Sequence, residues 1–234
     1  MKIAHIHWSL ATGGIETMLP DIVNEQAKEE VVALFIVNNK IENTILSKIN
    51  KTVKVFLIGR TEGSKNPWPL IKLNALLLKF NPDIIHTHAY KQSKLIWFKH
   101  NCLVRTIHNV HNNPLEYKKY KRLFAISETV KEYTEKQGYK SIVISNGIPI
   151  RQINNKVENK HNDGKIHAVQ VSRLYSRQKG QDILINAIGI LAQRGTIRNF
   201  IMHFIGSGDS LKTLQSLVIK NNLQDIIILV PLNL

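Results

Sequence analysis

The chain has 234 residues, 43% of them hydrophobic, which is enough to bury a core and unlike a disordered composition. Its apolar runs are too short to span a bilayer, and its first residues lack the apolar region of a secretory signal. The single cysteine, Cys102, excludes an internal disulfide framework. Lysine and arginine outnumber acidic residues by 32 to 17, which gives a formal charge of +15. We therefore expect a globular, cytoplasmic protein with affinity for polyanions.

The positive charge is concentrated in residues 51–122, which we call the basic block. This segment holds 14 lysine and arginine residues against three acidic ones, an excess of 11. Such a block attracts nucleic acid, phosphorylated sugars or an anionic membrane surface, and it is equally compatible with a solvated lysine-rich surface.

Short apolar runs alternate with longer segments of helical period in the first part of the chain. Most runs lack apolar–polar alternation, as parallel strands covered on both faces do. The predicted strands are 2–8, 31–37, 53–58, 83–88, 103–108, 122–126 and 141–145. The predicted helices are 14–29, 40–50, 67–80, 90–101 and 127–138. This order predicts a doubly wound α/β domain over residues 1–150.

Three residues indicate local features of these helices. Ser127 is a good N-cap for the helix that follows it, and Gly138 is expected to end that helix. Pro20 is expected to kink the first helix or to delay its start.

A second α/β pattern begins after residue 165. Residues 151–165 are almost without apolar side chains and are predicted to form a linker. Strands are then predicted at 166–172, 200–205 and 225–230, with helices at 179–194 and 209–222. Residues 166–234 are therefore predicted to form the first β-α-β-α-β elements of a second domain. Because the apolar strand 225–230 is followed by only four residues, we expect the sequence to be a truncated two-domain protein.

Open α/β sheets bind ligands beyond the carboxyl ends of their strands, so the residues there are the candidates for function. Gly13 and Gly14 follow the first strand at the start of a helix. Glycines in this position let a phosphate approach free backbone N–H groups, although a simple tight turn would use them as well.

Histidines lie at the carboxyl ends of two of the predicted strands. His86 and His88 share one face of the end of strand 83–88, and His108 ends strand 103–108, so imidazoles meet at one edge of the sheet. They could orient a sugar hydroxyl or stabilise developing charge. A metal could also bind them, but no carboxylate or thiolate accompanies them, and no metal is expected. His5 and His7 are interpreted as residues packed under a helix.

The stretch "VSRLYSRQKGQDILINAI" at 171–188 places Arg173, Arg177 and Lys179 between a strand and a helix. Cations at a helix start are unfavourable unless an anion binds there, because the helix dipole is itself positive at that end. Three cations beside free N–H groups suit a diphosphate. Gly206 and Gly208 in "FIGSGDS" would let a nucleotide lie against the backbone.

These motifs occur in the same order in the family 4 glycosyltransferases of the GT-B fold, which the sequence resembles from Met1 to about Ile228. The similar pieces are the glycine pair, "NPDIIHTHAY", "TIH", "AIS" with "SNGIPI", "VSRL" with "KG" and "LINAI", and "FIGSGDS", of which "SRLYSRQKG" is the most specific. The resemblance implies a Rossmann-like acceptor-side domain followed by part of a nucleotide-sugar-binding domain.

The resemblance also implies roles for individual residues. Arg173 and Lys179 would hold the donor diphosphate, and His108 would lie beside the transferred sugar; these three are the predicted catalytic residues. His88 would lie on the acceptor side. The predicted donor-binding residues are Gly13, Gly14, Arg173, Lys179, Gly206 and Gly208.

The implied reaction is a retaining transfer of a sugar from a nucleotide diphosphate sugar to a glycan or lipid-linked acceptor, without a metal or another cofactor. Bacterial surface polysaccharide synthesis is the implied setting. A lipid-linked acceptor would bring the basic block to the anionic inner face of the membrane as a peripheral contact.

The sequence departs from the family pattern in ways that are expected to impair activity. It lacks the paired glutamates, seven residues apart, that bind the donor, and the Gly-His before the second strand; Pro20 is also unusual. One alternative is therefore an inactive remnant or a partner subunit of a glycosyltransferase. A more distant alternative, a nucleic-acid-binding protein, rests on charge and on "EYKKYKRLF" at 116–124, but no recognition motif accompanies it, so no nucleic-acid partner is expected.

Overall fold

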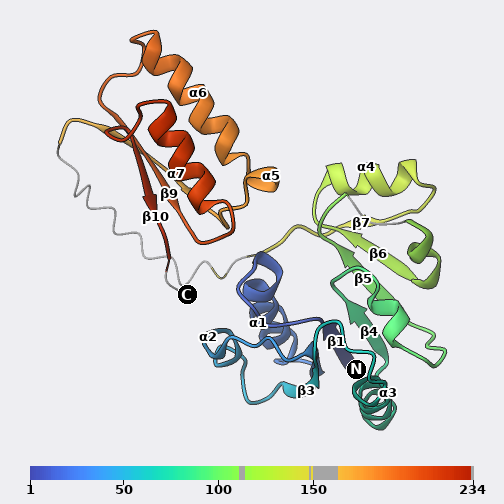
Figure 1. The fold of residues 1–234 in the computed structure, drawn as a ribbon. Helices are drawn as coiled ribbons and strands as arrows, with labels where there is room; N and C mark the ends of the chain where they lie inside the picture. Colours follow the sequence, from blue (N-terminus) through green and yellow to red (C-terminus); the bar gives the residue numbers. More distant parts are fainter. Residues whose placement is uncertain (111–113, 148, 150–162, 233–234) are drawn as a thin grey trace. The chain divides into compact units, whose positions relative to one another are not determined.

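The computed structural model of the protein describes residues 1–110, 114–147, 149 and 163–232 (Figure 1). The chain divides into two compact units, Met1–Asn154 and Asn155–Leu234, which we call the N-terminal and C-terminal units. Each contains its own parallel sheet, which confirms the predicted α/β class. Of the predicted linker 151–165, all but the last three residues lie outside the described part of the chain.

A seven-stranded parallel sheet forms the centre of the N-terminal unit, in the order β3-β2-β1-β4-β5-β6-β7. The order reverses between β1 and β4, as in doubly wound sheets. The strands are β1 Lys2–His7, β2 Val31–Asn38, β3 Lys54–Arg60, β4 Ile84–Thr87, β5 Leu103–Ile107, β6 Arg122–Ala125 and β7 Ile142–Val143.

Helices cover both faces of this sheet, which explains why its central strands are apolar without alternation. Helices α1 (Gly14–Gln26) and α2 (Asn43–Leu46) pack against Leu34 of β2 and its neighbours on one face. Helix α3 (Trp68–Phe80) packs against Phe35 on the other. Adjacent residues of β2 thus enter different cores, and both are fully buried.

The predicted helix 90–101 is wrong. The structure has only a 3₁₀ turn there, η1 (Gln92–Leu95), followed by extended chain. The buried side chain of Asn74 in α3 replaces the missing helical hydrogen bonds, since its Nδ2 donates to the carbonyl of Leu95 at 2.8 Å and its Oδ1 accepts from the N–H of Trp97 at 2.8 Å. Such a tertiary contact leaves no periodic signal in the sequence. The predicted helix 40–50 is also shorter than expected and is confined to α2.

Two of the three local predictions for the helices are confirmed. Ser127 caps α4 (Glu128–Lys136) by accepting the N–H of Val130 at 3.3 Å, and Gly138 follows that helix with a φ of +82°. Pro20 lies inside α1 and does not delay its start at Gly14, and the kink that was the other expectation stays a prediction. A second 3₁₀ helix, η2 (Pro114–Lys119), was not predicted.

The C-terminal unit has a three-stranded parallel sheet in the order β10-β9-β8. Its elements are β8 Ile166–Val171, α5 Ser176–Lys179, α6 Gln181–Gln193, β9 Phe200–Ile205, α7 Leu211–Lys220 and β10 Ile227–Val230. The side chains of α6 and α7 form one core with Met202 and Phe204 of β9. On the opposite side of the sheet, Val169, Val171 and Ile228 are 58%, 66% and 43% exposed. Among the described residues of both units, no helix is long and apolar enough to cross a membrane.

Candidate functional site

Five imidazoles gather near the carboxyl ends of β1, β4 and β5; we call them the histidine cluster. Parallel pairing places His5 of β1 opposite His86 of β4. The ring centroid of His88 lies 4.2 Å from the centroid of His86, 5.2 Å from that of His5, 6.0 Å from that of His108 and 6.3 Å from that of His7. The structure therefore brings His88 and His108 together at the sheet edge. It adds His5 and His7, which pack under α1 but also belong to the cluster.

Hydrogen bonds define the state of the most buried rings. His5 Nε2 lies 2.7 Å from Oε1 of Gln26 in α1, and since an amide oxygen only accepts, this nitrogen carries the proton. His5 Nδ1 is then unprotonated and carries a lone pair, and it lies 2.9 Å from Nε2 of His88. His86 Nε2 forms a hydrogen bond with Oγ1 of Thr106 at 2.8 Å. The rings are thus linked to each other and to two neutral polar side chains.

Burial keeps four rings of the cluster, His5, His86, His88 and His108, uncharged near neutral pH. It lowers the pKa of His5 to about 4 and that of His108 to about 4. It also places the pKa of His86 and that of His88 well below the usual range, and neighbouring histidines lower both further. These four rings are therefore neutral imidazoles that exchange hydrogen bonds or donate lone pairs, and they carry no charge with which to attract a phosphate.

Two buried residues that the sequence reading missed hold the loop after β4. Gln92 Oε1 accepts the N–H groups of His88 at 3.0 Å and of Ala89 at 2.9 Å. Glu116 Oε2 accepts the N–H of Lys91 at 2.9 Å and lies 3.6 Å from Nη1 of the buried Arg105. The spacing of four residues between His88 and Gln92 was the only available signal, and it is too common to have indicated this role.

The glycine pair is placed at the start of α1, where a phosphate site was predicted, but a carboxylate lies there. A Cβ on Gly13 would come within 2.2 Å of Oε2 of Glu16, whereas Gly14 faces open space. The other carboxylate oxygen of Glu16 lies 3.2 Å from His7 Nε2. Gly13 therefore makes room for Glu16, and phosphate binding by the two glycines stays a prediction.

The turn after β8 carries the three cations of the second motif; we call residues 172–180 the basic turn. Arg173, Arg177 and Lys179 are all exposed. The expectation that Lys179 begins the long helix is wrong. Lys179 ends the single turn α5, and α6 begins after Gly180, whose φ of +67° breaks the helix between them. The cations are thus grouped on one short segment.

A buried glutamine and two glycines hold the basic turn in place. Gln181 is fully buried, and its Nε2 donates to the carbonyl of Arg173 at 2.9 Å and to Oγ of Ser172 at 3.1 Å. A Cβ on Gly206 would come within 1.9 Å of the carbonyl oxygen of Ser172, and one on Gly208 within 2.4 Å of that of Leu174. Close backbone packing thus requires both glycines, whether or not a nucleotide also lies against them.

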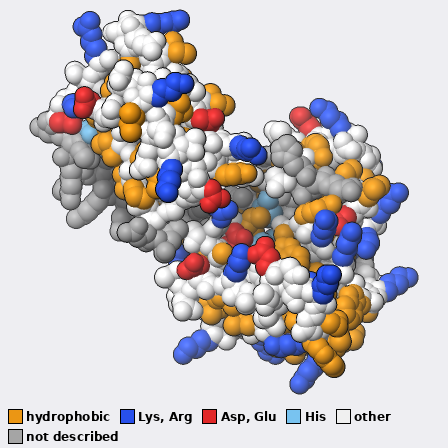
Figure 2. Space-filling model, viewed as in Figure 1, with side chains coloured by type: hydrophobic (Ala, Val, Ile, Leu, Met, Phe, Trp, Pro, Cys, Tyr) orange, Lys and Arg blue, Asp and Glu red, His pale blue; other side chains and the backbone are white. Residues whose placement is uncertain are grey.

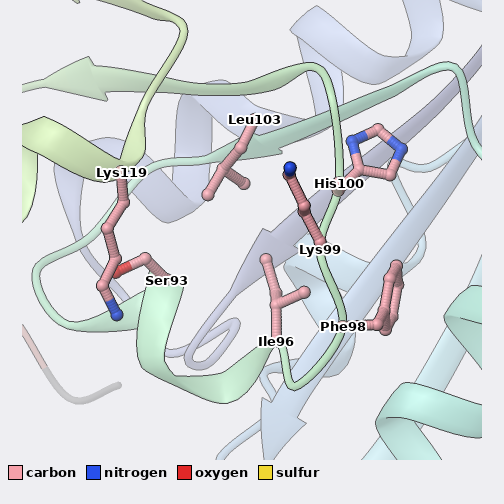
Figure 3. A pocket seen from close by; sticks show the side chains of 7 residues that line it. All are labelled: Ser93, Ile96, Phe98, Lys99, His100, Leu103 and Lys119. Atoms are coloured by element: carbon pink, nitrogen blue, oxygen red, sulfur yellow. The ribbon is translucent and has the colours of Figure 1, made fainter.

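A separate pocket of about 280 Å³ lies near the start of β5 (Figure 3). Apolar side chains from the segment before β5 combine there with Lys99 and Lys119. Its lining residues are Ser93, Ile96, Phe98, Lys99, His100, Leu103 and Lys119. The pocket is within the basic block, at the amino end of β5, so the histidine cluster does not line it.

The fold is similar to that of several solved structures. These include Anabaena Alr3699/HepE in complex with UDP and glucose (TM-score 0.72, 17% identity, covering 100% of this chain and 70% of that one). The lipopolysaccharide outer core galactosyltransferase WaaB is also similar (TM-score 0.64, 19% identity, 99% and 68% covered). A third is a mutant of S. aureus TarM in complex with fondaparinux, α-GlcNAc-glycerol and UDP (TM-score 0.70, 11% identity, 98% and 77% covered).

At these identities the likeness concerns the fold, and it confirms the expected GT-B architecture. The search of curated protein sequences gives no significant match. A family model described as Glycosyltransferase Family 4 matches residues 12–152, well over half of the chain. The protein therefore belongs to Glycosyltransferase Family 4.

Proposed function

We propose that the protein acts on a nucleotide diphosphate sugar, transferring its sugar to a glycan or lipid-linked acceptor with retention of configuration. The observation that carries the proposal is the basic turn, which groups Arg173 and Lys179 at the carboxyl end of β8 in a member of a glycosyltransferase family. The similar HepE and TarM structures contain UDP, which supports a uridine diphosphate as the first ligand to test.

The basic turn would act on the leaving group. As the sugar–phosphate bond breaks, negative charge develops on the diphosphate, and the guanidinium of Arg173 and the ammonium of Lys179 would stabilise it. Both side chains are exposed, and the hydrogen bonds from Gln181 hold the backbone that carries Arg173. The acceptor hydroxyl would attack from the same face of the sugar and pass its proton to a phosphate oxygen. No metal takes part in the proposed transfer.

The neutral state of His88 and His108 suits the sugar rather than the diphosphate. An oxocarbenium-like sugar carries positive charge, and a protonated imidazole beside it would repel that charge. Because burial lowers the pKa of His108 to about 4, this ring would donate or accept hydrogen bonds without opposing the reaction. His88 would serve the acceptor in the same way.

A lipid-linked acceptor and a cytoplasmic location at the inner membrane face are part of the proposal. The basic block carries exposed apolar residues as well as cations, including Trp68 at 69%, Leu115 at 67% and Trp97 at 55% exposure. Figure 2 shows hydrophobic side chains next to Lys and Arg over the part of the N-terminal unit that contains α3. Tryptophan and lysine side by side favour an anionic membrane interface. Bacterial surface polysaccharide synthesis would require such a contact.

A second candidate, a partner subunit without activity of its own, is favoured by the exposed apolar residues Val169, Val171 and Ile228 of the C-terminal sheet.

Thermal unfolding in the presence of ligands separates the alternatives. A nucleotide-sugar enzyme is stabilised by UDP and UDP-glucose and not by uridine, since the diphosphate supplies the contacts. Equal melting temperatures with UDP, ADP, GDP and no ligand would count against the donor assignment and leave the partner role.

A further inference from the structure

We propose that His5, His86 and His88 of the N-terminal unit bind one Zn²⁺ ion. No metal was expected from the sequence, because no carboxylate or thiolate accompanies His86, His88 and His108, and His5 was interpreted as a packing residue. In the structure His5 lies opposite His86 and supplies a third imidazole. One nitrogen of each ring lies within 4.8 Å of the other two, and among the described residues this is the group whose ligand atoms could hold a metal.

The spacing of these nitrogens is close to that of a zinc site. A tetrahedral zinc ion about 2.0–2.1 Å from each imidazole nitrogen holds its ligands about 3.4 Å apart. His5 Nδ1 and His88 Nε2 are 2.9 Å apart and would separate slightly, and His86 would approach them. All three side chains come from adjacent parallel strands or from the residue after one, so the backbone already fixes their positions.

Hydrogen bonds leave suitable lone pairs on two of the rings. Zinc-binding histidines usually direct their other ring nitrogen to a polar partner that fixes the ring. Gln26 accepts from Nε2 of His5 at 2.7 Å, and Thr106 bonds Nε2 of His86 at 2.8 Å. On His5, Nδ1 is thereby left with the lone pair, and on His86 Nδ1 is left as the ligand atom when Nε2 donates to the Thr106 hydroxyl. The rings are uncharged near neutral pH, and imidazole nitrogen is a preferred zinc ligand.

His88 would complete the group through Nε2. Its Nδ1 is buried and has no hydrogen-bond partner among the described residues. Without a metal, Nε2 carries the proton and Nδ1 is a bare lone pair. Zinc on Nε2 would move the proton to Nδ1. The metal site does not depend on the proposed function.

A second histidine pair in the C-terminal unit provides a matched control. His167 Nδ1 lies 2.9 Å from His203 Nε2, the same separation as between His5 and His88, and Asp163 contacts the other nitrogen of His167 at 3.1 Å. Among the residues that the structure describes, no third ligand atom completes a metal-binding group with this pair, so we expect it not to hold zinc.

The test uses the 234-residue chain, stripped with EDTA and dialysed against zinc, with metal content measured by plasma mass spectrometry. We expect one zinc ion per chain, a cobalt derivative with the visible absorption of a tetrahedral ion, and loss of both in His86→Ala. His203→Ala should retain the ion. Thr106→Val keeps all three ligands and should weaken the affinity for zinc about 10- to 100-fold. Absence of stoichiometric zinc, or equal loss in His203→Ala, would overturn the proposal.

Folding and function are tested separately. Circular dichroism of each variant shows whether a lost ion reflects a lost fold, and the Thr106→Val affinity remains informative where His86→Ala does not fold. ¹⁵N-labelled histidine should show His88 protonated at Nδ1 with zinc and at Nε2 without it. A proton that stays on Nε2 with zinc present contradicts the assignment. Loss of UDP binding with zinc binding intact would count only against the proposed function.

Discussion

Nδ1 of His5 lies 2.9 Å from Nε2 of His88, although the two residues are 83 positions apart in the sequence. The contact depends on the reversal of strand order, which makes β4 the neighbour of β1. It buries several imidazoles together at one sheet edge, so the stability of the N-terminal unit is coupled to their protonation.

Acid should destabilise the N-terminal unit at a pH where its carboxylates are still charged. Burial lowers the pKa of His5 from 6.5 to about 4. The unfolded chain therefore binds a proton that the folded chain excludes, so this contribution is complete above pH 6.5 and is lost as the pH falls toward 4. The loss is on the order of 3 kcal/mol. Urea unfolding with EDTA across this range measures it, and a flat profile would contradict the buried neutral state.

The glycines beside the basic turn should differ sharply from the glycine at the start of α1. Gly208→Ala places a Cβ within 2.4 Å of a backbone oxygen, so we expect a loss of about 1–3 kcal/mol in unfolding free energy. Gly14→Ala is the control, because its Cβ meets open space. Denaturant unfolding of both variants provides the comparison. Equal stabilities would mean that the close approach is relieved at little cost.

Gln181 should affect both stability and ligand binding. Gln181→Leu removes two hydrogen bonds and leaves the carbonyl of Arg173 without this donor, for an expected cost of about 1–3 kcal/mol. UDP affinity should fall as well, because the turn that carries Arg173 loses its support. Calorimetry on the folded variant would show whether the two effects occur together; unchanged affinity would limit Gln181 to a structural role.

Membrane contact should depend on the lysines of the pocket near β5. Each lysine at an anionic surface contributes about 1 kcal/mol, so the double change Lys99→Gln and Lys119→Gln should weaken binding to phosphatidylserine vesicles about 30-fold. Lys212→Gln with Lys220→Gln removes the same charge from the C-terminal unit as a control. Co-sedimentation at low salt is the measurement. Equal losses in both double variants would mean that only net charge matters.

The sheet could be predicted from the sequence because most of its strands are buried on both faces and read as uninterrupted apolar runs, as β2 does. The 3₁₀ turn and extended chain at 90–101 could not be predicted, since Asn74 of α3 satisfies backbone groups of this segment through a tertiary contact that has no period in the sequence. For the site, proximity to a strand end was enough to select His88, His108, Arg173 and Lys179 as candidates. Neither the pairing of His5 with His86 nor the burial of Gln181 has a local signal, because both depend on strand order and packing.

The most direct test of the proposed donor site is the affinity of the chain for UDP, measured by calorimetry for the native protein and for two variants. Arg173→Gln removes a charge-assisted contact to the diphosphate and should weaken binding about 10- to 100-fold. Arg177→Gln removes the same charge from the same turn and should change affinity by less than about threefold. UDP binding that Arg173→Gln leaves intact would contradict the assignment of the basic turn as the diphosphate site, and equal losses in both variants would contradict a specific role for Arg173.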